Sequence, residues 1–287
     1  MLISTHLNIL GYITWNPNPN IFDLGFYALR WYSVLFLGGF VLSYLIVKHR
    51  FKTALVNPYL LDRLTIYTVA GTLVGARLGH CLFYDWDYYH SHLIEIILPF
   101  QFSPHFKITG YQGLASHGGG IGIFIALWLY HRKYHKDISL LWVMDQLALV
   151  VPLAGCCIRL GNLMNSEIIG RPAELSWAFI FVRDDGIPRH PAQLYEAIAY
   201  LGIFIVLNLV VKYRPSKNGF LMGLFLALIF TARFLLEGLK EDQVAFEAHM
   251  SLNMGQLLSI PFIVAGIILI IIKSGKNAVS SDKMETT

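Results

Sequence analysis

"LLWVMDQLALVVPLAGCCIRLGNLMNSEIIGRP", residues 140–172, is the stretch that decides the fold. Its first half is an apolar run close to the roughly 20 residues that a helix needs to cross a bilayer. Its second half adds, within a few residues, Arg159, Asn162, Asn165, Glu167 and Arg171. Charged side chains are costly in lipid and turn toward the protein interior or a wet cavity. The stretch therefore predicts a membrane-spanning helix whose polar end enters a site.

The composition extends this reading to the whole chain. Of 287 residues, 55% are hydrophobic and 14% charged, whereas soluble domains carry about 25% charged residues. Seven apolar stretches can cross a bilayer, and each must be helical because hydrocarbon offers no hydrogen-bond partners. We expect an all-α integral membrane protein, residues 1–287 forming one membrane-embedded domain. Its seven transmembrane helices are expected at about 25–47, 64–84, 116–131, 138–158, 195–212, 219–237 and 254–272.

The placement of basic residues predicts the orientation. Lysine and arginine gather in alternate loops, at 48–63, 132–136 and 212–217, and in the C-terminal tail 273–287. By the positive-inside rule these parts are cytoplasmic and the N-terminus lies outside. The segment 159–194 would then lie outside although it holds four arginines. That exception indicates that these arginines have a task other than topology.

An α-helix rises 1.5 Å per residue, so the depth of each residue along its expected span can be estimated. These depths place polar groups from six spans in the outer half of the bilayer. A single central polar cavity in the outer leaflet is the economical way to keep them out of lipid. The groups are Tyr32, Arg77, His117, Arg159, Asn162, Tyr195, Glu196, Arg233 and Glu237.

Each group also has a purely structural explanation. Arg233 and Glu237 have the i, i+4 spacing of a helical salt bridge. Arg77 could extend to the outer interface, and the glycines after His117 are typical of close helix packing. Asp145, in the inner half, is better explained as a helix-pairing group than as a catalyst. The shared depth of the outer residues, rather than any one of them, favours a site.

The chemistry of this layer suits an anionic lipid. Guanidinium groups bind phosphate bidentately and keep their charge, and a histidine with a pKa of about 6.5 suits a general base. The chain has neither an HExxH nor a GxSxG motif, and its three cysteines predict neither a disulfide nor a zinc site. We therefore expect a lipid-phosphate site with His117 as acid–base group, no metal or cofactor, and no nucleic-acid partner.

Several motifs point to one family. The chain has "GARLGHCLFY" at 75–84, "SHGGGIG" at 116–122, "GCCIRLGNLMNSEIIGRP" at 155–172, "RHPAQLYEA" at 189–197 and "ARFLLEG" at 232–238. With them it resembles the bacterial prolipoprotein diacylglyceryl transferases along nearly its whole length. It departs from the family at Lys240, where arginine is usual, at His80, often tyrosine, and in a short outer loop at 172–188.

The resemblance implies an inner-membrane enzyme with its active site toward the periplasm. Its substrates would be phosphatidylglycerol and the lipobox cysteine of prolipoprotein signal peptides, and its products a thioether-linked lipoprotein and glycerol phosphate. The family-essential positions correspond to Tyr32, His117, Arg159, Asn162, Glu167, Gly170, Arg233 and Glu237.

The site residues receive roles on this basis. His117 would deprotonate the thiol, and Arg159 and Arg233 would stabilise the departing phosphate, to which Tyr32 would donate a hydrogen bond. Head-group binding and arginine positioning would fall to Asn162, Asn165, Glu167, Gly170, Arg77 and Glu237.

A transporter or channel for a phosphorylated solute is the main alternative, because it too would use arginines in a cavity. Its polar residues should continue to the cytoplasmic side, whereas here they stop near mid-membrane. A seven-helix receptor would explain the number of spans and little else.

Overall fold

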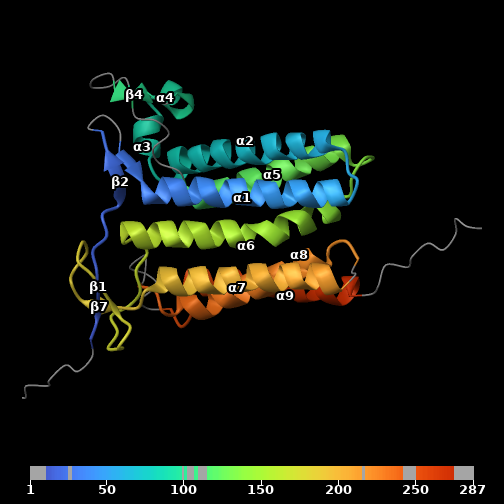
Figure 1. Ribbon diagram of the computed structural model, residues 1–287. Coiled ribbons are helices and arrows are strands. Elements are labelled where there is room, and N and C mark those ends of the chain that lie inside the picture. Colours follow the sequence, from blue (N-terminus) through green and yellow to red (C-terminus); the bar gives the residue numbers. More distant parts are fainter. Residues whose placement is uncertain are drawn as a thin grey trace, which may run out of the picture. The chain divides into compact units, whose positions relative to one another are not determined.

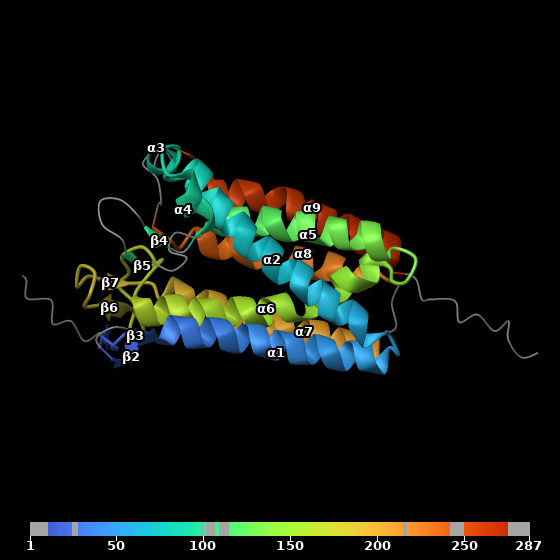
Figure 2. The same ribbon diagram turned by 90° about the horizontal axis from the view of Figure 1, so that it is seen from above.

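The computed structural model describes residues 11–24, 28–98, 100–101, 107–108, 115–214, 217–241 and 250–274. These residues are mostly helical (Figures 1 and 2). The helices are α1 (Trp31–Thr53), α2 (Pro58–Phe83), α3 (Trp86–Tyr89), α4 (Leu93–Ile97), α5 (Ser116–Tyr134), α6 (Leu140–Asn165), α7 (Ala192–Tyr213), α8 (Phe220–Glu237) and α9 (Met254–Lys273). The strands are β1 (Ile13–Trp15), β2 (Asn20–Asp23), β3 (Ala28–Arg30), β4 (Phe100–Gln101), β5 (Lys107–Ile108), β6 (Phe179–Phe181) and β7 (Pro188–Arg189).

Six helices of the described chain are long and apolar enough to cross a membrane: α1, α2, α6, α7, α8 and α9. The expected span 116–131 is helix α5, which is not among the six; its apolar part lies between a glycine-rich start and the basic residues of its last turn. Seven spans, their orientation and a central cavity therefore stay predictions. Helix α6 continues to Asn165, beyond the expected end at residue 158, because backbone hydrogen bonding does not stop where apolar side chains do.

Small sheets add to the helices, although the sequence predicted no strands. Strand β1 pairs in parallel with β6, which pairs antiparallel with β7; Figure 2 labels β6 and β7. The other two sheets are the pairs β2–β3 and β4–β5. Aromatic residues of β6, Phe179 and Phe181, form a buried cluster with Leu163 near the end of α6, and Trp15 donates to the Leu163 carbonyl at 2.9 Å. The sheet thus anchors the polar end of α6.

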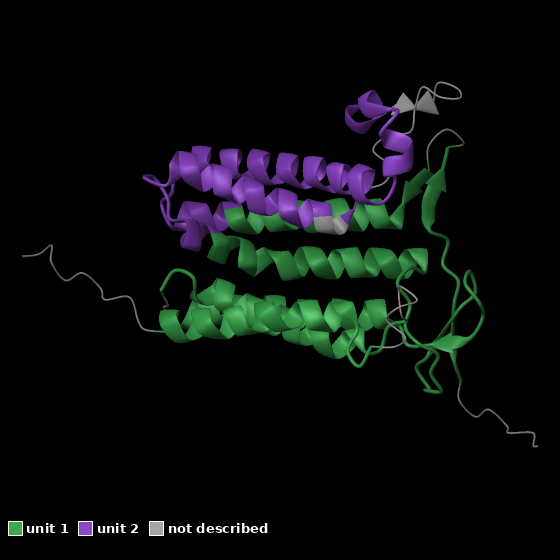
Figure 3. Cartoon of the chain, turned by 180° about the vertical axis from the view of Figure 1, so that it is seen from behind, with its two compact units in different colours: residues 1–47, 144–287 green, residues 48–143 purple. Residues whose placement is uncertain are grey.

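The chain forms two compact units (Figure 3). Unit 1 comprises residues 1–47 and 144–287, and unit 2 comprises residues 48–143. In unit 1 the carboxylate of Asp145 accepts hydrogen bonds from the backbone amides of Gly219 (2.7 Å) and Met222 (2.8 Å). Asp145 therefore caps the start of α8, in agreement with the helix-pairing role expected for it.

Unit 2 is built on a close contact between α2 and α5. A Cβ atom on Gly79 would lie 2.7 Å from the Cα of Gly118, and one on Gly75 would collide with the Gly118 carbonyl oxygen. The Tyr130 hydroxyl adds a hydrogen bond to the Leu60 carbonyl at 3.0 Å. Small residues let the two helical backbones touch, which is how helices associate where no hydrophobic driving force acts between them.

We expect Gly75→Ala to destabilise unit 2 by about 1–3 kcal/mol, the usual cost of overpacking a tight contact. The clash is with backbone, which cannot rotate away. Thermal unfolding of the full chain in detergent, followed by circular dichroism, measures the effect. Gly120→Ala is the matched control, because a Cβ atom on Gly120 of α5 meets nothing within 4 Å. Equal melting temperatures for the two variants would contradict this account of the packing.

Candidate active site

The polar end of α6 is followed by an unusually tight backbone segment. Ser166 and Ile168 both have φ of 56°, a left-handed conformation that costs a non-glycine residue roughly 1–2 kcal/mol. The segment then passes close to two others, since the Gly170 amide donates to the His190 carbonyl at 3.0 Å and the Arg171 amide donates to the Leu239 carbonyl at 2.9 Å. This strained turn directs Glu167 back toward α6.

The Glu167 carboxylate is held by two amide side chains. Asn162 donates to its Oε2 and Asn165 to its Oε1, each at 3.1 Å. The side-chain amide of Gln193 in α7 donates to the Glu167 carbonyl at 2.5 Å. Asn162 in turn accepts a hydrogen bond from the Arg159 guanidinium at 3.2 Å. Glu167 is thereby connected to Arg159 through Asn162.

Arg159 is also the first member of a chain of five charged side chains, which we call the arginine network: Arg159, Glu196, Lys240, Glu237 and Arg233. The Arg159 Nε lies 2.9 Å from Glu196 Oε2, and the Lys240 Nζ lies 2.9 Å from Glu196 Oε1. The same Nζ lies 3.1 Å from Glu237 Oε2, which is 3.8 Å from the Arg233 Nε. Charges of alternating sign thus link α6, α7 and α8.

The residues at the centre of the network are buried, and those at its two ends are partly exposed. The side chains of Glu196, Lys240 and Glu237 are 1%, 5% and 9% exposed, whereas those of Arg159 and Arg233 are 18% and 41% exposed. Buried charges require such pairing, because an isolated charge in a low-dielectric interior is very costly. The arrangement leaves a partly exposed guanidinium group at each end of the network, each beside a buried carboxylate.

Tyr32 lies at the Arg159 end. A Cβ atom on Gly161, two residues after Arg159, would lie 2.8 Å from Cδ2 of Tyr32. Tyr32 therefore packs directly against α6, and it is within electrostatic range of both Glu167 and Arg159. Glycine at position 161 makes this approach possible.

The arginines of the segment after α6 have separate tasks. Arg183 donates to the Met164 carbonyl at 2.6 Å, so it satisfies a terminal carbonyl of α6. Arg189 donates to the Gly170 carbonyl at 3.1 Å and to Glu241 at 3.2 Å, and it pairs with Asp185. The guanidinium of Arg189 also holds the pKa of the Asp185 carboxyl below its usual value. These two arginines hold the segment that follows α6 and are not members of the chain that links Arg159 to Arg233.

Two expected site residues belong to unit 2. Arg77 donates to the backbone carbonyls of Ile96 (3.0 Å) and Glu95 (2.6 Å), and its guanidinium lies 4.9 Å above the Tyr89 ring. It thus holds the short helices α3 and α4 against α2. His117 is in the first turn of α5, and its side chain lies outside the described residues. The binding role of Arg77 and the catalytic role of His117 stay predictions.

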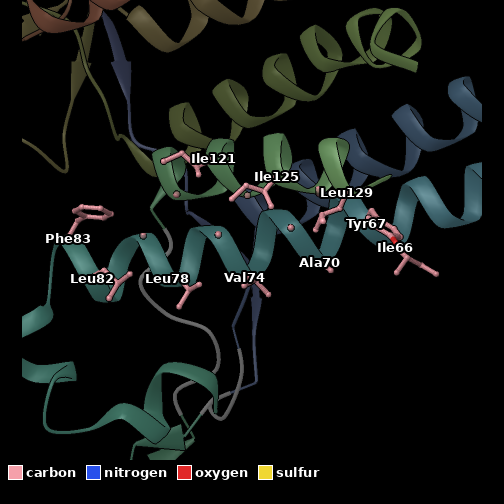
Figure 4. Close-up of a pocket in the computed structure, with 16 residues that line it drawn as sticks. Ile66, Tyr67, Ala70, Val74, Leu78, Leu82, Phe83, Ile121, Ile125 and Leu129 are labelled. Atoms are coloured by element: carbon pink, nitrogen blue, oxygen red, sulfur yellow. The ribbon is translucent and has the colours of Figure 1, made fainter. Parts of the chain in front are cut away.

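Unit 2 also carries an apolar groove of about 560 Å³ along α2 and α5 (Figure 4). Its walls are side chains such as Val74 and Leu78 on α2 and Ile121 and Ile125 on α5, and glycines of both helices form its floor. The groove follows from the glycine contact between α2 and α5. The glycines that let the two backbones touch have no side chains, so a gap remains between the apolar side chains of α2 and those of α5. A surface of this kind suits an acyl chain.

The structure brings together the expected site residues of unit 1: Tyr32, Arg159, Asn162, Asn165, Glu167, Gly170, Arg233 and Glu237. The sequence grouped Glu196 with these residues but gave it no role. It overlooked Gln193, and it noted Lys240 only as a departure from the family. The "RHPAQLYEA" motif contains both Gln193 and Glu196. Lys240 stands three residues after Glu237, a spacing that favours contact.

Comparisons with known proteins agree with these motifs. Residues 19–272 match the model of the family described as Prolipoprotein diacylglyceryl transferase. The chain is similar to the phosphatidylglycerol–prolipoprotein diacylglyceryl transferase of Bacteroides fragilis, at 48% identity over 95% of this chain and 99% of the relative. Proteins of the same name from Tolumonas auensis (44% identity, 92% and 98% coverage) and Porphyromonas gingivalis (40%, 96% and 99%) are also similar. All three are named as transferases and none as a transporter.

Proposed function

The chain belongs to the prolipoprotein diacylglyceryl transferase family, and from this premise we propose that it modifies prolipoproteins with a lipid. It transfers the diacylglyceryl group of phosphatidylglycerol to the thiol of the lipobox cysteine. The cysteine sulfur forms a bond to the glyceryl carbon as the bond from that carbon to the phosphate oxygen breaks. The products are a thioether and glycerol phosphate, which keeps the electron pair of the broken bond.

The arginine network carries the assignment of the site. The departing phosphate gains negative charge as the carbon–oxygen bond breaks, and cations fixed beforehand around it stabilise the transition state more than the ground state. Arg159 uses its Nε for Glu196 and one Nη for Asn162, so the guanidinium has further N–H groups for a phosphate. Arg233 offers its accessible guanidinium from the other end of the network.

The remaining residues complete the mechanism. His117 takes the thiol proton, because the thiolate is the nucleophilic form. Tyr32, packed beside Arg159, donates a hydrogen bond to the phosphate, and Arg77 contributes to lipid binding. The amides Asn162 and Asn165, with Glu167, bind the glycerol head group. No step in this scheme uses a metal or an organic cofactor.

We place the enzyme in the bacterial inner membrane as a single seven-span domain, with its active site toward the periplasm. Six membrane-length helices support a multi-pass protein, and α5 provides the seventh span. The distribution of lysine and arginine in the loops supports the orientation. The apolar groove of unit 2 accommodates one acyl chain of the lipid.

The activity is tested with the purified full-length protein, phosphatidylglycerol and a lipobox peptide. Intact-mass spectrometry should show that the peptide gains one diacylglyceryl group, with release of glycerol phosphate. A peptide in which serine replaces the acceptor cysteine is the control and should gain nothing. A wild-type protein that leaves the cysteine peptide unmodified, or that modifies the serine peptide, would contradict the proposal.

Gly170→Ala is expected to slow transfer roughly 10- to 100-fold, or about 1.4–2.7 kcal/mol in the barrier. A Cβ atom there would lie 2.5 Å from the His190 carbonyl oxygen and 2.9 Å from that of Leu239. These are backbone atoms, so the segment carrying Glu167 must shift away from the residues that precede Lys240. Rates from the mass assay measure the effect. Gly202→Ala on α7 is the control and should transfer at the wild-type rate, because an added Cβ there meets nothing within 4 Å. A Gly170→Ala enzyme as fast as wild type would contradict the close fit of Gly170 against the backbones of His190 and Leu239.

A further inference from the structure

Lys240 is a buried cation at the centre of the arginine network. It follows the end of α8 and is 4% exposed, and its backbone forms a bridge with Gly170. Its ammonium donates a hydrogen bond to Glu237 Oε2 at 3.1 Å and forms an ion pair with Glu196 Oε1 at 2.9 Å. Lysines are almost never fully buried unless they are paired, so this placement requires both carboxylates.

Each of these carboxylates also orients one arginine. Glu196 of α7 holds Arg159 at 2.9 Å, whereas Glu237 of α8 stands 3.8 Å from Arg233. Within the described residues, Lys240 is a charged group in contact with both carboxylates. Its ammonium therefore links the Arg159–Glu196 pair to the Arg233–Glu237 pair.

The charge balance shows what the loss of Lys240 would do. The three cations of the arginine network are balanced by its two carboxylates together with Glu167, which Asn162 connects to Arg159. Without Lys240 this set would carry one net negative charge. The two carboxylates, no longer shared with an ammonium, would attract the guanidinium groups more strongly and would oppose an anionic lipid.

We propose that Lys240 is a positioning residue of the active site: its ammonium, shared by Glu196 and Glu237, keeps Arg159 and Arg233 spaced and available for one lipid phosphate. The inference rests on the proposed function. An ammonium is a compact charge that fits between two carboxylate oxygens, whereas a guanidinium is a planar fork. The shared requirement is a permanent cation.

Three substitutions separate charge from packing. Lys240→Arg keeps the cation and should transfer within about threefold of wild type. Lys240→Gln keeps hydrogen-bond donors but no charge and should lower kcat roughly 10- to 100-fold, with the peptide KM unchanged. Lys240→Met also loses the donors and should be slower still; if it does not fold, Lys240→Gln carries the test. Lys217→Gln, in the loop between α7 and α8, is the matched control and should be unaffected.

A second measurement tests whether Lys240 acts through the arginines. When Arg233→Lys is already present, adding Lys240→Gln should cost much less in kcat than it does in wild type, because the guanidinium that it positions is gone. If the fold losses in kcat of Arg233→Lys and Lys240→Gln simply multiply in the double variant, the inference is overturned. A Lys240→Gln enzyme as fast as wild type would also overturn it. Either result would leave the proposed function standing. A wild-type protein without transfer activity would instead overturn the proposed function.

Discussion

Arg233→Ala is expected to lower the rate of diacylglyceryl transfer roughly 100- to 1,000-fold, the usual loss when one preorganised donor to a developing anion is removed. The substitution removes one of the two guanidinium groups that we propose to flank the departing phosphate. The side chain is 41% exposed, so its loss should change stability little. Steady-state kinetics by intact-mass spectrometry should show the loss mainly in kcat, because the interaction strengthens in the transition state.

Two further variants make the Arg233 result specific. Arg233→Lys keeps the charge but not the bidentate geometry, so its rate should lie between those of wild type and Arg233→Ala. Arg214→Ala is the matched control: this arginine follows α7 and its guanidinium lies 4.9 Å above the Phe220 ring, apart from the network. A rise in KM with an unchanged kcat for Arg233→Ala would show that Arg233 binds the ground state and the transition state equally, and would contradict its proposed role in stabilising the departing phosphate.

His117→Asn is expected to slow transfer by roughly 10²–10⁴-fold near neutral pH, the range typical of general-base catalysis. The deficit should shrink as the pH rises through about 8.5, because the peptide thiol then ionises without help. The wild-type rate should rise with pH as more of the histidine loses its proton and becomes a base.

A pH–rate profile for both enzymes checks this expectation. His135→Asn is the matched control, since this exposed histidine follows the C-terminus of the same helix. Full activity of His117→Asn at neutral pH would remove His117 as the base. A deficit that stays constant across the pH range would assign it a role other than proton transfer.

The sequence predicted the positions of the helices better than their ends. Apolar length alone located six membrane-length helices, but α6 continues past its apolar part to Asn165. That extra length matters, because Arg159 and Asn162 are held on the same rigid helix as the residues in the apolar segment. Estimating depth along each helix grouped Arg159 with Arg233, and the structure connects the two through Glu196, Lys240 and Glu237. Their shared depth in a bilayer stays a prediction.

Contacts between distant segments were beyond this reasoning. Strand β1 pairs with β6, joining Ile13 to Phe179, and neither short strand has a pattern that specifies the other as its partner. The left-handed backbone at Ser166 and Ile168 has no glycine to signal it. Lys240 was recognised as a departure from the family, but its burial between Glu196 and Glu237 depends on three segments meeting.

A structure of the full-length protein with bound phosphatidylglycerol tests the central claim most directly. Our account predicts that the guanidinium groups of Arg159 and Arg233 both lie within hydrogen-bond distance, about 3 Å, of oxygens of the same phosphate. A phosphate contacted by only one of the two arginines, or bound away from both, would contradict it.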